Sequence, residues 1–106
     1  MISPENGSFP NMKSGLSLES IVVVNSVTVS TDLDGEIIIL EMNKGVYFGL
    51  DAVGAEVWKM LQQPRRLREV HDVILRDYDV APEVCERDLL SLLNDLVRNG
   101  LVEAVE

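Results

Sequence analysis

Alternation of apolar and polar residues predicts strands in the first half of the chain. Residues 20–31 read SIVVVNSVTVST, where β-branched residues dominate and the Asn25-Ser26 pair marks a bend. Asp34-Gly35 is a strong turn signal, and the apolar run EIIILEM follows it at residues 36–42. These features predict a first hairpin.

A second hairpin follows directly. Asn43-Lys44-Gly45 offers a glycine able to adopt a positive φ, and VYFGL then forms a short strand at residues 46–50. The pattern therefore predicts three antiparallel strands that follow one another in chain order.

The second half of the chain has helical periodicity. Asp51 is suited to cap a first helix, whose core stripe we expect at Val53, Val57 and Leu61, with Pro64 ending it. A second helix is expected at about residues 67–76, followed by a loop at 77–81. Pro82 suits the first position of a third helix, which runs to Arg98 or Asn99 and is closed by Gly100 in a left-handed conformation.

These elements predict an α+β fold, winged-helix-like, with a three-stranded antiparallel sheet followed by three helices. Residues 1–17 are rich in Pro, Gly, Ser and Asn and lack periodicity, so we expect a flexible tail before one domain at residues 18–106.

Composition narrows the classes of function. The 106 residues carry a net charge of -9, which disfavours non-specific binding to nucleic acid and favours a neutral or basic partner. A single cysteine excludes an internal disulfide, and no signal peptide or membrane span is evident, so we expect a cytoplasmic protein.

Candidate catalytic chemistry is sparse. His71 and Cys85 are the only histidine and cysteine, and they act as a catalytic pair only if helices two and three bring them together with an orienting group. In the alternative interpretation, Cys85 is a small hydrophobe on the apolar stripe of helix three. No phosphate-binding loop, serine elbow or metal-ligand spacing is present, so we expect no enzyme, no metal and no cofactor.

A winged-helix outline raises DNA binding as an alternative, with helix three as the reading helix. That helix carries mostly acidic charge: Glu83, Glu86, Asp88 and Asp95, against Arg87 and Arg98. A major groove would repel it. The Arg65-Arg66-Arg68 cluster lies before helix two, where we expect a solvated turn or a protein contact.

The strand at residues 46–50 has no later strand of similar strength to pair with, so one backbone edge is expected to be free. Such an edge can accept an extended peptide as an added strand. Val46 and Phe48 would point to one face of the sheet, and Tyr47 and Gly49 to the other. The alternative is that the N-terminal tail covers this edge.

Several motifs resemble a known family. These are the acidic-Gly turn, the run KGVYFGLDAVGAEVW, the Tyr78-Asp79-Val80 loop with Pro82, Asp88, and the closing Leu96…Asn99-Gly100-Leu101. Together, over about residues 27–102, they look like the PqqD-like precursor-peptide recognition domains, also called RiPP recognition elements. A free-standing chain of this kind is most similar to the leader-binding component of lasso-peptide biosynthesis.

The resemblance implies a function in peptide (antibiotic) biosynthesis. Such domains bind the leader segment of a ribosomal precursor beside the third strand and helix three, without catalysis. The implied partners are a leader-cleaving cysteine protease and an ATP-dependent cyclase. We expect the domain itself to be a monomer. A chaperone that delivers a precursor peptide to a radical maturase, as in pyrroloquinoline quinone biosynthesis, stays open as an alternative.

Carried onto this sequence, the resemblance implies a peptide-binding site shared by one strand and one flank of helix three. Its residues are Lys44, Gly45, Val46, Tyr47, Phe48 and Gly49 from the strand, and Val84, Arg87, Asp88, Ser91, Leu92 and Asp95 from the helix. The opposite flank, Glu86, Leu90, Leu93 and Val97, is the alternative wall. The polar N-terminal extension and the arginine cluster depart from the family pattern.

Overall fold

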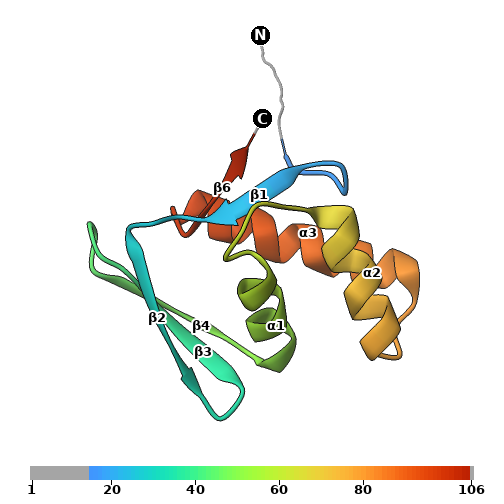
Figure 1. Ribbon diagram of the computed structural model, residues 1–106, viewed down its shortest axis with the longest axis horizontal. Coiled ribbons are helices and arrows are strands. Elements are labelled where there is room, and N and C mark those ends of the chain that lie inside the picture. The colour runs from blue at the N-terminus through green and yellow to red at the C-terminus, as the bar shows by residue number, and fades with distance from the viewer. Residues whose placement is uncertain (1–14, 106) are drawn as a thin grey trace, which may run out of the picture.

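The order of helices and strands is that of a mixed α+β domain, which confirms the predicted class (Figure 1). The structure is a computed structural model, and it describes residues 15–105. The strands are β1 (Ile21–Val24), β2 (Thr28–Leu33), β3 (Glu36–Glu41), β4 (Val46–Leu50), β5 (Arg65–Arg66) and β6 (Val102–Val105). The helices are α1 (Ala52–Met60), α2 (Leu67–Asp77) and α3 (Pro82–Arg98).

Strands β2, β3 and β4 form the predicted antiparallel meander. Asp34 and Gly35 both have positive φ, at 58° and 88°, in the first turn, and Gly45 has φ 69° in the second. Ile39 lies opposite Ser30 on one side and Phe48 on the other. The turn residues of the sequence thus set the register of this sheet.

The stretch at residues 20–31 is two strands rather than one bent strand. Asn25 breaks it, because its side-chain oxygen accepts from the Val27 backbone N–H at 3.1 Å and its carbonyl accepts from the Thr28 hydroxyl at 2.8 Å. This turn sends β1 and β2 into different sheets.

A second sheet, in the order β5-β1-β6, was not predicted. Val22 pairs with Arg65 in β5 and with Ala104 in β6, which joins the start of the domain to its end. Both partner strands are short and have no strong β signal of their own, so the expectation of three strands alone was wrong. The C-terminal strand pairs with β1 and leaves β4 at the edge of its own sheet.

The helix ends follow the predicted capping signals except at the end of α1, which stops at Met60, before the Pro64 that was expected to end it. The Asp51 carboxylate accepts from the Gly54 backbone N–H at 2.9 Å, and Pro82 occupies the first turn of α3. Gly100 has φ 76°, and the Leu101 backbone N–H donates to the Leu96 carbonyl at 2.9 Å. These contacts satisfy backbone groups that a helix terminus leaves unpaired.

The core lies between the sheets and the helices, and α1 packs on the meander (Figure 1). Trp58 is buried, and its indole N–H donates to the Ser30 hydroxyl at 3.1 Å. Gly54 is also buried, and it lies so close to β4 that a Cβ at this position would stand only 3.2 Å from the Leu50 Cβ. The expectation that Val53 belongs to the core stripe was wrong, since its side chain is 38% exposed.

The arginine cluster is exposed to solvent, and its side chains also bond to neighbouring segments of the domain. Arg66 donates to the Glu19 backbone carbonyl at 2.8 Å, Arg68 pairs with the Glu19 carboxylate, and Arg65 donates to the Met60 carbonyl at 3.1 Å. These bonds attach the segment before β1 to the start of α2.

The first 14 residues of the predicted tail lie outside the described residues. Leu16, the second residue described, packs partly against the core. Between residues 15 and 105, the structure has no helix long and apolar enough to cross a membrane.

Candidate functional site

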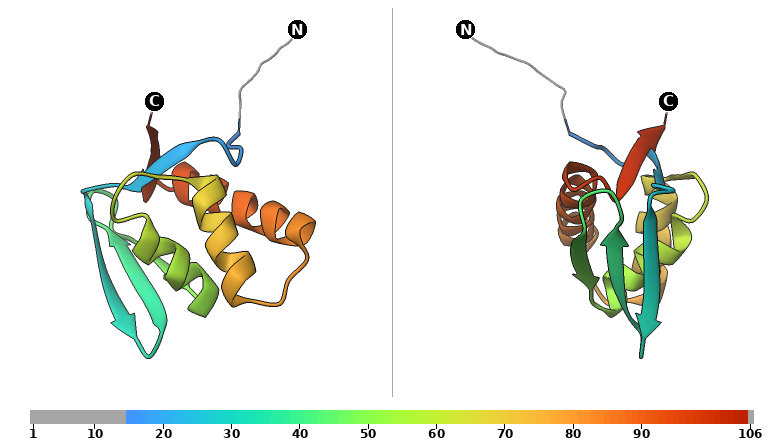
Figure 2. Two further views of the ribbon diagram at one scale, coloured as in Figure 1. Left: turned by 45° about the vertical axis from the view of Figure 1, so that its right-hand side comes forward. Right: turned by 90° about the vertical axis from the view of Figure 1, so that its left-hand side faces the viewer.

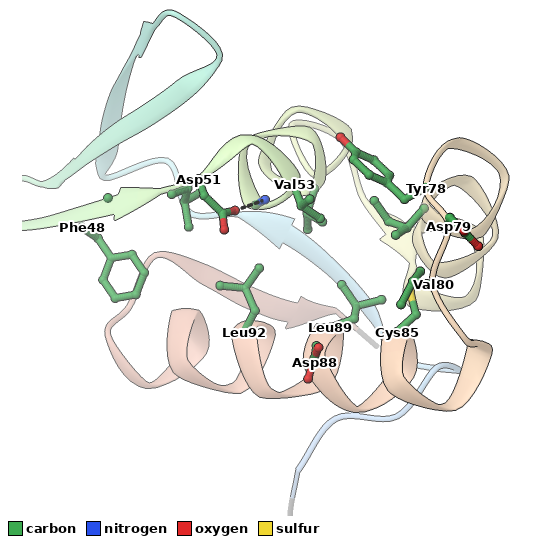
Figure 3. Close-up of a pocket in the computed structure, with 15 residues that line it drawn as sticks. Phe48, Asp51, Val53, Tyr78, Asp79, Val80, Cys85, Asp88, Leu89 and Leu92 are labelled. Carbon is green, nitrogen blue, oxygen red and sulfur yellow. Dashed lines mark hydrogen bonds between the residues drawn. The ribbon is translucent and has the colours of Figure 1, made fainter.

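A hollow of about 590 Å³ lies between the end of β4, the start of α1 and the first three turns of α3 (Figure 3). It is lined by Phe48, Gly49, Leu50, Asp51, Val53, Gly54, Val57, Ile74, Tyr78, Asp79, Val80, Cys85, Asp88, Leu89 and Leu92. Most of these side chains are apolar. The size and character of the hollow suit an apolar ligand group.

One wall is β4, the edge strand of its sheet. It pairs with β3 on one side, and no other strand among the described residues pairs with its second side. That second side is turned toward α3 (Figure 2, right). Phe48 projects from the strand toward the helix, opposite Leu92 (Figure 3). An unpaired row of backbone groups therefore borders an apolar hollow.

The facing wall is one side of α3. Cys85, Asp88, Leu89 and Leu92 recur at three- and four-residue spacing, so they share one face of the helix. Leu89 and Cys85 are buried, while Leu92 is only half-buried. The helix thus contributes both to the core and to the hollow.

The loop after α2 closes one end of the hollow. Tyr78, Asp79 and Val80 stand there, and Val53 reaches in from α1 (Figure 3). The exposure of Val53 follows from this position, because the side chain borders the open hollow instead of the packed core.

The only ionisable carboxylates on the hollow are those of Asp51, Asp79 and Asp88, and none of its lining residues is cationic. Asp51 already accepts the capping hydrogen bond of α1, and Asp88 pairs with Arg87 at 3.5 Å. Burial raises the pKa of the Cys85 thiol, and the nearby Asp88 carboxylate raises it further. The hollow therefore favours neutral or cationic groups and an uncharged thiol.

The structure brings part of the predicted peptide-binding set to the hollow. Phe48, Gly49, Asp88 and Leu92 line it. Val84, Ser91 and Asp95 follow the same flank of α3, with Ser91 facing solvent, and Arg87 is held on Asp88. Lys44 and Gly45 lie in the exposed turn before β4 and Val46 at its exposed first position, all beyond the lining residues.

Tyr47 lies apart from the other predicted residues. It is 70% exposed and borders a shallow depression on the other face of the sheet, with Val29, Ile38 and Leu40. Its backbone still belongs to the free edge of β4, although its side chain does not reach the hollow.

The opposite flank of α3 contributes nothing to the lining. Leu93 is fully buried, Leu90 packs against the core, and Glu86 and Val97 are exposed away from the hollow. Of the two flanks that the sequence left open, the one with Asp88 and Leu92 borders the hollow.

Several lining residues were missed from the sequence: Leu50, Asp51, Val53, Gly54, Val57, Ile74, Tyr78, Asp79, Val80, Cys85 and Leu89. The Tyr78-Asp79-Val80 motif carried a signal, because it belongs to the family pattern. Val53 carried none, since its apolar spacing is that of an ordinary core residue.

His71 and Cys85 make different contacts. The His71 Nε2 lies 3.1 Å from the Pro82 carbonyl, while Cys85 borders the hollow. Within residues 15–105, no group of three or more histidine, cysteine or acidic residues is arranged to hold a metal ion.

An α+β domain with an edge strand facing a helix across an apolar hollow has the form of a peptide-recognition domain. Residues 36–102 match the family described as Coenzyme PQQ synthesis protein D (PqqD). The chain belongs to this family and is a PqqD-like RiPP recognition element.

Two solved structures share the fold. TbiB1 in complex with the TbiA(beta) leader peptide is 36% identical, with a TM-score of 0.73 over 79% of this chain and 98% of that chain. A lasso peptide synthetase B1 complexed with its leader peptide is 21% identical, with a TM-score of 0.69 over 77% of this chain and 96% of that chain. No curated protein matches the chain.

Proposed function

We propose that this chain binds the leader segment of a ribosomal precursor peptide as an added strand along β4, in the hollow that faces α3. It then presents the precursor to a leader-cleaving cysteine protease and an ATP-dependent cyclase of lasso-peptide assembly. The observation that carries this proposal is the unpaired edge of β4 bordering an apolar hollow. The likeness to TbiB1, solved with a leader peptide, supports it.

In this proposal the backbone of β4 contributes affinity for the leader, and the side chains that line the hollow contribute specificity. Main-chain groups of residues 45–49 give affinity that does not depend on the sequence of the leader, because any extended peptide presents the same donors and acceptors. Phe48, Leu92 and the loop residues Tyr78 and Val80 give specificity, because they shape the apolar space that a leader side chain fills.

The proposed role is non-catalytic. The one thiol near the bound peptide is kept in its uncharged form, and His71 is engaged with a backbone carbonyl. Chemistry on the precursor is therefore assigned to the partner enzymes, and this domain supplies position and local concentration.

The match to Coenzyme PQQ synthesis protein D favours one other candidate, a chaperone that delivers its peptide to a radical maturase. Both roles use the same groove and differ in the enzyme that follows. Reconstitution of the domain and its precursor with each enzyme class separates them by the mass of the product.

A scan of N-methylated leader peptides tests strand addition directly. Methylation removes one backbone donor and leaves the side chain in place, so it should weaken binding at every second position of the docked segment. Each lost hydrogen bond is expected to raise the Kd by about fivefold, as measured by fluorescence anisotropy with a labelled leader. Losses without the two-residue period would contradict the strand geometry.

The hollow is tested by Phe48→Ser, which removes a half-buried aromatic ring that faces it. Loss of this apolar contact should weaken leader binding by about tenfold or more. Val97→Ser is the matched control, because Val97 is 37% exposed on the opposite flank of α3. Equal Kd values for the two variants, with both folded by circular dichroism, would rule out this site.

A further inference from the structure

Glu41 is the one carboxylate that is buried among the described residues 15–105, with 4% of its surface exposed. It is the last residue of β3, and the other inward positions of that strand are Ile37 and Ile39. An apolar residue would continue this row. Burying a carboxylate destabilises a fold by more than one hydrogen bond to it stabilises, so the packing of the core does not explain a glutamate here.

The hydrogen bonds of Glu41 close the turn between β3 and β4. Its side-chain Oε1 accepts from the Lys44 backbone N–H at 2.7 Å, and its backbone carbonyl accepts from the Gly45 N–H at 2.9 Å. Gly45 has φ 69°, a conformation that favours glycine. One residue of β3 therefore holds two successive amides of the turn.

Packing does little to hold this turn. Asn43, Lys44 and Gly45 are all exposed, and a Cβ placed on Gly45 would meet no atom within 4 Å beyond its chain neighbours. The far end of β4 differs, since Leu50 is buried and Asp51 caps α1. The start of β4 therefore depends on hydrogen bonds, whereas its end is held by packing.

Glu41 lies directly across the sheet from Val46, the first residue of β4. The backbone of residues 45 and 46 would pair with one end of the proposed leader strand, beyond the residues that line the hollow. At that end the leader has no apolar contact with the hollow, so binding there depends on the direction of backbone donors and acceptors. Hydrogen bonds weaken steeply as their angles become less linear, so a displaced turn would weaken this end of the pairing first.

Resting on the proposed function, we propose that Glu41 is a positioning residue for the leader. Its carboxylate holds the Lys44 amide, and through the turn it keeps the backbone of Gly45 and Val46 in line with the rest of β4. The leader binds to the strand edge and not to the buried carboxylate itself. An edge that is already ordered raises the affinity, because the leader does not have to order it on binding.

Two substitutions separate this role from that of a purely structural residue. Glu41→Met keeps the length of the side chain, removes the acceptor and places an apolar group at a buried position, so the urea midpoint should equal or exceed that of the wild type. The leader Kd, measured by fluorescence anisotropy, should nevertheless rise by about tenfold. Glu41→Gln retains an oxygen that can accept from Lys44, and its Kd should lie within about twofold of the wild-type value.

The series of N-methylated leader peptides locates the effect along the strand. In Glu41→Met, methylation at the leader position that pairs near Val46 should weaken binding little further, because that hydrogen bond is already weakened. Methylation near Gly49 should weaken binding as much as in the wild type. Glu36→Met is the matched control, since it makes the same substitution at the exposed other end of β3 and should change the leader Kd by less than about twofold.

Four results would overturn the inference. These are an unchanged leader Kd for Glu41→Met, a Kd for Glu41→Gln as high as that for Glu41→Met, a lower urea midpoint or an unfolded chain for Glu41→Met, and methylation losses that do not differ between the two ends of β4. Failure of the wild type to bind leader would instead refute the proposed function, whereas equal binding by the wild type and Glu41→Met refutes only the role of Glu41.

Discussion

Cys85 shows how one side chain can belong to the core and to a binding surface. It is buried with Leu89 and Leu96, yet its sulfur borders the hollow (Figure 3). Burial is the main cause of its raised pKa, and the Asp88 carboxylate adds to it. The neutral thiol is therefore favoured throughout the physiological range.

Thiol labelling tests this description. Because the folded-state pKa is raised, Cys85 contributes stability below the pKa of the unfolded chain and loses it as the pH rises through the folded value. Iodoacetamide labelling at pH 8, followed by mass spectrometry, should be at least about tenfold slower in the native domain than in urea. Bound leader should slow it further. Native labelling as fast as in urea would contradict the buried position.

Val53 marks the limit of sequence reasoning about single residues. Its spacing to Val57 and Leu61 predicts a core position, but α1 packs on the meander through Gly54, Ala55 and Trp58. Gly54 allows the helix to approach Leu50 closely, and the neighbouring Val53 lines the hollow. Periodicity identifies an apolar stripe, whereas close packing at one glycine decides which edge of the stripe remains open.

At the scale of elements, α1 begins where β4 ends. Asp51 lies between the two elements, and its side chain both caps the helix and borders the hollow. The cap thereby holds the first turn of α1, with Val53, against the end of the edge strand.

Asp51→Ala should destabilise the domain by about 1 kcal/mol, because the Gly54 backbone N–H loses its acceptor. In urea unfolding this corresponds to a midpoint lower by roughly 0.7 M for a domain of this size. Asp51→Asn is the control, since an asparagine oxygen accepts the same hydrogen bond and should retain most of the stability. An unchanged midpoint for the alanine variant would show that the Asp51 cap does not stabilise the domain.

Elements specified by local signals were predictable, and elements specified by distant pairing were not. The turns at Asp34-Gly35 and Gly45, the Pro82 start and the Gly100 terminus set β3, β4 and α3 within one residue of their predicted bounds. Strands β5 and β6 exist because β1 pairs with both, although each lies far from β1 in the sequence. Neither has enough β propensity to be read from its own residues.

The candidate site divides in the same way. Its β4 and α3 walls follow from the family pattern and from helical spacing, so Phe48, Gly49, Asp88 and Leu92 were predictable. Val57, Ile74 and Cys85 join it only because three helices meet there. Tyr47 was predicted to belong to the same site as Phe48, but successive side chains of a strand point to opposite faces, so the Tyr47 side chain lies on the face of the sheet away from the hollow.

The charge of the whole molecule acts on every partner that approaches it. A net charge of -9 surrounds a hollow whose only charged lining residues are three aspartates. Such a field accelerates the approach of a cationic peptide and slows that of an anionic one. We therefore expect a leader with lysine or arginine near its docking segment.

Leader binding should accordingly weaken with salt. Between about 50 mM and 500 mM NaCl the Debye length falls from roughly 14 Å to about 4 Å, so attraction between exposed charges is largely screened. We expect the Kd, measured by fluorescence anisotropy, to rise by about fivefold, mainly through slower association. Asp79→Asn and Asp88→Asn should each flatten this dependence, because both carboxylates border the hollow.

Glu103→Gln is the control for these variants, since it removes the same charge from an exposed position on β6, away from the groove. Glu103→Gln should lower the affinity for the leader only by reducing the net charge, so the loss should be smaller than for Asp79→Asn or Asp88→Asn. If all three variants behave alike, the aspartates of the hollow act only as part of the general field. If salt has no effect on the wild type, recognition is carried by backbone pairing and apolar contact alone, and the expectation of a basic leader is wrong.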